Sequence, residues 1–114
     1  MLQHAIKNEI LRTLTNSLKI YKVILFGSFS TGTADRDSDI DLIVVTDDDS
    51  MPRSYRESMQ NYLSVSTALR DIKARVPIDL IVHTKPMHEE FIHLGSMFSK
   101  DVIKRGEVLY EKDN

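Results

Sequence analysis

The sequence contains no cysteine, no long apolar run and no large excess of either charge. Without cysteine the chain can form neither a disulfide nor a thiolate metal site, which fits a reducing cytoplasm, and we expect the protein there. No stretch approaches the roughly 20 apolar residues that cross a bilayer, and the N-terminal segment lacks the apolar core of a signal peptide. We therefore expect no membrane association.

The charges nearly cancel, because 15 Lys and Arg stand against 17 Asp and Glu, a net charge of −2. General binding of nucleic acid relies on clustered positive charge, so this class of partner is not expected. With 114 residues, 41% of them hydrophobic, the chain is expected to form one domain over residues 1–114 with an ordinary core.

Apolar residues recur with two different periods along the chain, which indicates both helices and strands. Helices are predicted over residues 2–18 and 55–76, after Thr84, and up to Gly106, with one helical turn at 28–32. Strands are predicted over residues 21–26, 40–46, 78–83 and 108–110. This order predicts an α/β (α+β) fold, in which helices cover a sheet.

Two aspartates enter the second predicted strand. Asp39 and Asp41 are two residues apart in extended chain, so their side chains leave the same face, about 6–7 Å apart. Asp79 opens the third strand, which could lie beside the second and complete a set of three carboxylates. Carboxylates suit a hard ion such as Mg²⁺, and two-metal sites hold ions about 3.5–4 Å apart. Asp39, Asp41 and Asp79 are therefore predicted to be catalytic and to bind two Mg²⁺ ions.

A glycine and a serine follow the first predicted strand. Gly27 can adopt a backbone conformation that brings N–H groups close to a phosphate. Ser28 adds a hydroxyl donor, and a helix that starts there would point its positive end at a nucleotide. Gly27 and Ser28 are thus predicted to bind nucleotide. Either motif alone is weak, since most such turns are only turns; the combination with the aspartates carries the prediction.

Two other motifs fail on spacing. A calcium loop that began at Asp35 would need glycine and glutamate where the chain has Ile40 and Thr46. His88 and His93 are five residues apart, so on a helix they point about 140° from each other and do not easily share a zinc ion. The run of aspartates at 47–49 is predicted to be an exposed loop.

The motif Gly27-Ser28, ten residues, then Asp39-Ile40-Asp41 resembles the signature of the minimal nucleotidyltransferase family, within the DNA polymerase β-like superfamily. The resemblance extends over nearly the whole chain. It implies a mixed sheet flanked by helices, a nucleoside triphosphate substrate, ATP, and Mg²⁺. It also implies that Asp79 completes the metal site. Many members carry Arg before the second glycine of the turn, where this chain has Thr31.

The resemblance implies a function as well. Larger relatives carry an extra domain that binds the acceptor, and 114 residues leave little room for one. Stand-alone members resemble antitoxins that pair with an HEPN-type toxin and add AMP to a toxin tyrosine, so a protein adenylyltransferase antitoxin is expected. Two alternatives stay open: a non-catalytic nucleotide-binding module that neutralises its partner by occlusion, and transfer to a small molecule. The acceptor and the oligomeric state do not follow from the sequence.

Overall fold

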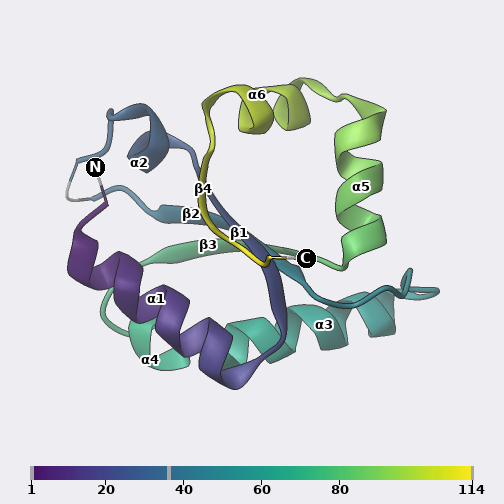
Figure 1. The fold of residues 1–114 in the computed structure, drawn as a ribbon. Helices are drawn as coiled ribbons and strands as arrows, with labels where there is room; N and C mark the ends of the chain where they lie inside the picture. Colours follow the sequence, from purple (N-terminus) through teal and green to yellow (C-terminus); the bar gives the residue numbers. More distant parts are fainter. Residues whose placement is uncertain (1, 36, 114) are drawn as a thin grey trace.

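A computed structural model describes residues 2–35 and 37–113 of the chain (Figure 1). In chain order its elements are α1 (His4–Ser17), β1 (Ile20–Phe26), α2 (Ser28–Thr31), β2 (Ile40–Thr46), α3 (Tyr55–Ala68), α4 (Arg70–Lys73), β3 (Ile78–His83), α5 (Lys85–Leu94), α6 (Met97–Arg105) and β4 (Glu107–Glu111). The helices and strands expected from the sequence are all present. Among the described residues, no helix combines the length and the apolar character needed to span a bilayer.

The four strands form one sheet in the order β3-β2-β1-β4. β1 runs antiparallel to both β2 and β4, whereas β2 and β3 are parallel, so the sheet is mixed, as the resemblance implied. Parallel neighbours need a crossover connection, and here α3 and α4 supply it. β2 is central and its residues are almost all buried, which explains its nearly continuous apolar run (Ile40–Thr46).

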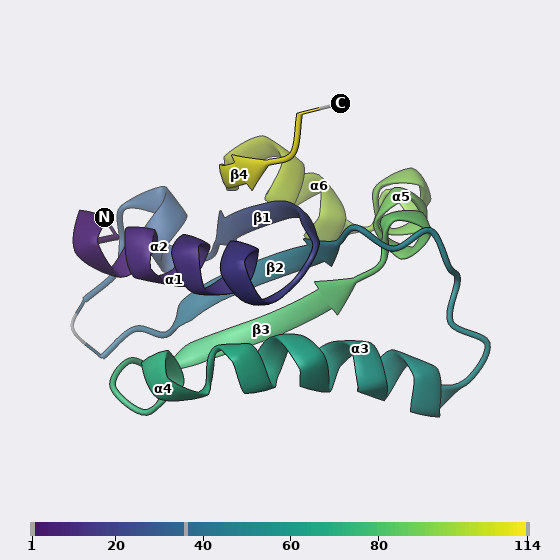
Figure 2. The same ribbon diagram turned by 60° about the horizontal axis from the view of Figure 1, so that its bottom comes forward.

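Helices cover the two faces of the sheet to different extents (Figure 2). α1, α3 and α4 pack on one face, where the larger hydrophobic cluster lies. Its fully buried members include Leu14 of α1, Leu25 of β1, Leu42 of β2 and Leu69 after α3. The opposite face carries α5 and α6 over a smaller cluster, built round Ile24, Ile43, Val45 and Val102. The second face is therefore the less enclosed one.

Local signals in the sequence account for where α5 begins. The Thr84 hydroxyl accepts a hydrogen bond from the Met87 amide, and a proline occupies the first turn. Both features favour a helix start because the first amides of a helix lack partners inside it. The predicted start after Thr84 is confirmed.

Two local predictions are corrected. The helix predicted over residues 55–76 is divided at Leu69, whose φ of −91° and ψ of 5° leave the helical range. This bend allows Leu69 and Ile72 both to reach the core. Asp47 is not a solvated loop residue: its carboxylate pairs with Lys85 at 3.1 Å and with Lys112 at 2.6 Å. It therefore ties the end of β2 to α5 and to the chain's last residues.

Leu42→Ala should lower the free energy of unfolding by about 2–5 kcal/mol, because it leaves a cavity in the fully buried centre of β2. Leu63→Ala is the matched control: Leu63 is 50% exposed on α3, and its truncation should cost about 0.5 kcal/mol or less. Urea denaturation measures both. Equal losses for the two variants would contradict this description of the core.

Candidate active site

Strand register brings the predicted site residues to one end of the sheet. In the parallel pair, Asp41 of β2 lies directly beside Asp79 of β3. In the antiparallel pair, the same Asp41 lies beside Phe26, the last residue of β1 and the neighbour of Gly27. Three strands thus bring the glycine bend, Asp41 and Asp79 into one row.

Asp41 and Asp79 share one face of the sheet, and Asp39 lies close by. Side chains alternate along a strand, so Asp41 lies on the face of Ile43, and the register places Asp79 on the face of Ile81. Asp39 comes just before β2, and its charge contributes to the raised pKa of Asp41. Ile43 and Ile81 belong to the hydrophobic cluster under α5 and α6. Asp41 and Asp79 therefore lie on the less enclosed face; Asp39 and Asp79 are exposed and Asp41 is half-buried.

Gly27 lies in direct contact with the Asp41 carboxylate. Its φ is +72°, in the region that favours glycine. A Cβ atom at Gly27 would lie only 2.1 Å from Asp41 Oδ2 and 3.1 Å from Asp41 Cγ. The sequence predicted a glycine here so that a phosphate could approach the backbone. In the structure, the space left by the missing side chain is filled by the Asp41 carboxylate.

The carboxylates of the predicted site influence one another's ionisation. The pKa of Asp41 is raised above its ordinary value, first because burial disfavours the charged form, then because Asp79 and Asp39 place negative charge nearby. A positive ion would relieve both the burial penalty and the repulsion. The half-buried Asp41 is therefore the member of the set that gains most from a cation.

The donor set fits a hard divalent cation, since it consists of carboxylate oxygens alone. Within residues 2–35 and 37–113, however, no three His, Cys, Asp or Glu side chains are grouped so closely that they could hold one ion as they stand. Ionised carboxylates repel each other, so rotation of the side chains is needed before Asp39, Asp41 and Asp79 could share one. The register of β2 and β3 places Asp41 directly beside Asp79.

The segment after Gly27 is a single turn, α2, of four residues. The amides of Ser30 and Thr31 donate to the Gly27 carbonyl at 3.1 and 3.2 Å. The amides of Ser28 and Phe29 belong to the first turn, where no partner within the helix is available. This turn could therefore bind an anion through individual N–H groups, not through the dipole of a long helix.

Thr31 lies at the end of α2, just before Gly32. Its hydroxyl lies 3.0 Å from that of Thr33 and 3.3 Å from the Gly27 carbonyl. Threonine here closes the turn on itself and adds no positive charge.

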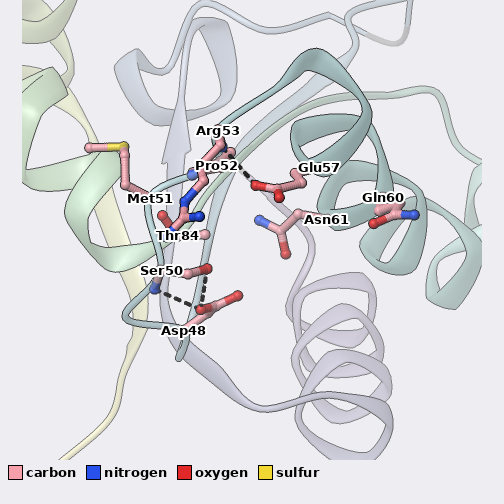
Figure 3. A pocket seen from close by; sticks show the side chains of 9 residues that line it. All are labelled: Asp48, Ser50, Met51, Pro52, Arg53, Glu57, Gln60, Asn61 and Thr84. Carbon is pink, nitrogen blue, oxygen red and sulfur yellow. Dashed lines mark hydrogen bonds between the residues drawn. The ribbon is translucent and has the colours of Figure 1, made fainter.

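A pocket lies at the other end of the sheet. Figure 3 shows the side chains that line it. It has a volume of about 720 Å³ and includes Asp48 after β2 and Thr84 after β3. Asp41 and Thr46 are five residues apart on β2, so roughly 17 Å separates the aspartates from this pocket. Its acidic groups are already engaged: Asp48 accepts hydrogen bonds from the Ser50 amide and hydroxyl at 2.8 and 2.7 Å. This pocket therefore lies apart from the predicted site residues.

One neighbour of the site was missed by the sequence reasoning. The ring of Phe98, in α6, meets the ring of Phe26 edge-on, with centroids 5.4 Å apart. Phe26 is adjacent to Gly27 in sequence and to Asp41 across the sheet. Only tertiary packing brings residue 98 here, and its sequence context carries no signal that distinguishes it from an ordinary helix residue.

A mixed sheet with adjacent carboxylates beside a glycine bend defines a class of enzyme that transfers phosphoryl or nucleotidyl groups. The family described as polymerase β, nucleotidyltransferase has a model that matches residues 8–114, so the chain belongs to this nucleotidyltransferase family. A proposed protein adenylyltransferase of Methanocaldococcus jannaschii is 29% identical over 110 residues, which cover 91% of this chain and 98% of the relative.

Solved structures show the same fold. A crystal structure described as a toxin–antitoxin with AMP-PNP has a TM-score of 0.59 at 22% identity, over 94% of this chain and 74% of that one. A proposed nucleotidyltransferase from Sulfolobus solfataricus has a TM-score of 0.54 at 20% identity, over 95% of this chain and 76% of that one. At these identities the likeness is one of fold.

We expect Mg²⁺ and ATP to raise the melting temperature of the wild type, and Gly27→Ala should abolish that rise, because the new methyl group would displace the Asp41 carboxylate. Gly32→Ala is the matched control. Gly32 also has a positive φ, of +79°, but a Cβ atom there meets nothing within 4 Å. Gly32 is in the left-handed region, with ψ of 15°, so Gly32→Ala should cost about 1–2 kcal/mol of stability. Gly27, with ψ of −153°, is in a region that essentially only glycine adopts, and a Cβ there would also meet Asp41, so Gly27→Ala should cost more. Thermal denaturation with and without Mg²⁺ and ATP separates them, and an undiminished rise in Gly27→Ala would refute the displacement.

Asp41→Asn should stabilise the metal-free protein at neutral pH. A carboxyl group whose pKa is raised by folding contributes most below its unfolded pKa, and that contribution is lost as pH rises through the folded pKa. The gain from Asp41→Asn should therefore grow as pH rises above about 4, the ordinary pKa of an aspartate, and level off once the folded carboxyl group is fully ionised. Denaturation at a series of pH values measures it.

Asp48→Asn is the control for this charge effect. Hydrogen bonds from Ser50 lower the pKa of Asp48, so loss of its charge should not stabilise the protein. A gain at Asp48 equal to that at Asp41 would mean that general charge, rather than the site, causes the effect.

Proposed function

We propose that this chain transfers AMP from ATP to a hydroxyl group of a partner protein and thereby acts as an antitoxin. The observation that carries the proposal is the row formed by Gly27, Asp41 and Asp79, with the charge of Asp39 close to Asp41. The relative named for protein adenylylation and the toxin–antitoxin neighbours support the choice of a protein acceptor. A tyrosine of an HEPN-type toxin is the acceptor we propose.

Each site residue has a role in this proposal. Gly27 and Ser28 hold the terminal phosphates through backbone N–H groups and the serine hydroxyl. Asp39, Asp41 and Asp79 hold Mg²⁺, which when bound neutralises charge on the α-phosphate and the leaving group. The close contact of Gly27 with Asp41 places the phosphate cradle and the metal-binding carboxylate side by side.

In this proposal Asp79 is the residue that activates the acceptor hydroxyl. It lies on β3, an edge strand, and its side chain is exposed, so a hydroxyl that arrives from solvent can reach it. The acceptor oxygen forms a bond to the α-phosphorus, the bond from that phosphorus to the β-bridging oxygen breaks, and pyrophosphate leaves. Asp79 accepts the hydroxyl proton, and a divalent ion held beside it would lower the pKa of the hydroxyl.

The exposure of Asp39 and Asp79 favours a macromolecular acceptor over a small one. A buried small-molecule site surrounds most of its ligand, whereas these carboxylates lie on the less enclosed face of the sheet. Exclusion of water from the reacting atoms then falls to the acceptor itself. A protein that presents its hydroxyl on a folded surface can supply that cover.

The test is to incubate the chain with ATP, Mg²⁺ and the product of the adjacent gene, and then to weigh that product. We expect a mass gain of one AMP per modified hydroxyl, and label from α-labelled ATP on the same protein. Replacement of both Asp39 and Asp41 by Asn should abolish the transfer, because the metal loses two of its ligands. Asp35→Asn and Asp37→Asn, at exposed positions nearby in sequence, should leave it unchanged.

Two outcomes would contradict this function. Undiminished transfer after loss of Asp39 and Asp41 would exclude the carboxylate mechanism. Absence of any mass gain, combined with inhibition of the partner that survives both substitutions, would instead favour neutralisation by occlusion.

A further inference from the structure

Exposed apolar side chains concentrate on one part of the described structure. Six of the nine large hydrophobic side chains that are exposed fall between Ile92 and Val108, in α5, α6 and β4. Three of them meet where α5 turns into α6: Leu94, 72% exposed, Met97, 90% exposed, and Phe98, 42% exposed. These three residues are the α5–α6 corner.

The fold does not need Leu94 or Met97 for its core. α6 buries Ser99 and Val102 instead, and neither Leu94 nor Met97 belongs to a hydrophobic cluster. Two large apolar side chains held in water at a tight turn, where Gly95 has a φ of +62°, contribute little to folding. A surface of this kind is typical of a contact with another molecule.

The corner is continuous with the candidate active site. Phe98 meets Phe91 of α5 at 5.7 Å and Phe26 of β1 at 5.4 Å between ring centroids. Phe26 in turn lies beside Asp41 across the sheet. A chain of aromatic contacts therefore links the exposed corner to the strand end that carries the carboxylates, on the same face.

Charge on α6 indicates what kind of surface fits here. Lys100 and Lys104 lie three and seven residues after Met97, so all three side chains share one side of the helix. Both lysines are exposed, and in the described part of the chain neither has a carboxylate within salt-bridge distance, whereas Arg105 pairs with Asp101. An acidic rim on the partner would complement them.

We infer that the α5–α6 corner, with Lys100 and Lys104 beside it, docks an apolar and acid-rimmed surface of the protein that carries the acceptor hydroxyl. The inference rests on the proposed function and locates its protein contact. Docking at the corner holds the acceptor over the exposed carboxylates, and the partner then supplies the cover that this face lacks. Leu94 and Met97 are binding residues, not catalytic ones.

Two double variants test the corner: Leu94→Ser with Met97→Ser, and Lys100→Glu with Lys104→Glu. Each should raise the KM for the acceptor protein, taken as the product of the adjacent gene, by about tenfold or more. The KM for ATP and the kcat at saturating acceptor should stay unchanged, because docking is separate from the chemistry. The effect of the charge reversal should diminish at high salt.

Matched controls lie on α3, which packs against the opposite face of the sheet. Leu63→Ser and Arg56→Glu change an exposed leucine and an exposed arginine, and both should leave the KM for the acceptor as it is. Phe98 is left intact because its contacts with Phe26 and Phe91 make it a packing residue.

An unchanged KM for the acceptor in both double variants would overturn the inference. AMP transfer by the wild type in the same experiment would still support the proposed function. A raised KM for ATP would assign the corner to the nucleotide, and a change in the sedimentation of the chain alone would assign it to a second copy; either result overturns the inference. Calorimetric titration with the same partner tests docking even if no AMP is transferred: weaker binding by the variants supports the corner, and equal binding refutes it.

Discussion

In-register pairing of β2 with β3 aligns Asp41 with Asp79, and the same pairing aligns Leu42 with Leu80 on the opposite face. Because side chains alternate, a slip of one residue would turn Asp79 into the core and a leucine into solvent. The burial of Leu42 and Leu80 under α1 and α3 therefore determines the register of the carboxylates on the other side. Hydrophobic packing on one face of the sheet thus positions Asp41 and Asp79 on the other face.

The two ends of β2 carry aspartates in opposite electrostatic situations. Lys112 and Lys85 lower the pKa of Asp47 at the far end, whereas burial, Asp79 and Asp39 raise the pKa of Asp41 at the site. The first arrangement favours folding at neutral pH, and the second opposes it. Such a conflict between local stability and the folded arrangement is typical of a functional site, where a bound cation supplies the missing charge.

Unequal coverage of the sheet explains why the site is open. The face under α1, α3 and α4 buries a large cluster, while α5 and α6 cover a small one and leave Asp39 and Asp79 exposed. Phe98 lies at the boundary between the covered part and the carboxylates through its contact with Phe26. The predicted site residues therefore lie on the face of the sheet that the protein's own helices cover least.

The sequence by itself determined the elements and the chemical groups, because apolar periodicity, turn residues and carboxylate pairs are local properties. The strands beginning at Ile40 and Ile78, and the helix after Thr84, follow from neighbouring residues alone. Tertiary structure decided the rest: the break at Leu69, the ion pairs of Asp47, the contact of Gly27 with Asp41, and the arrival of Phe98 beside the site. Each of these depends on residues distant in sequence, whose packing no local pattern records.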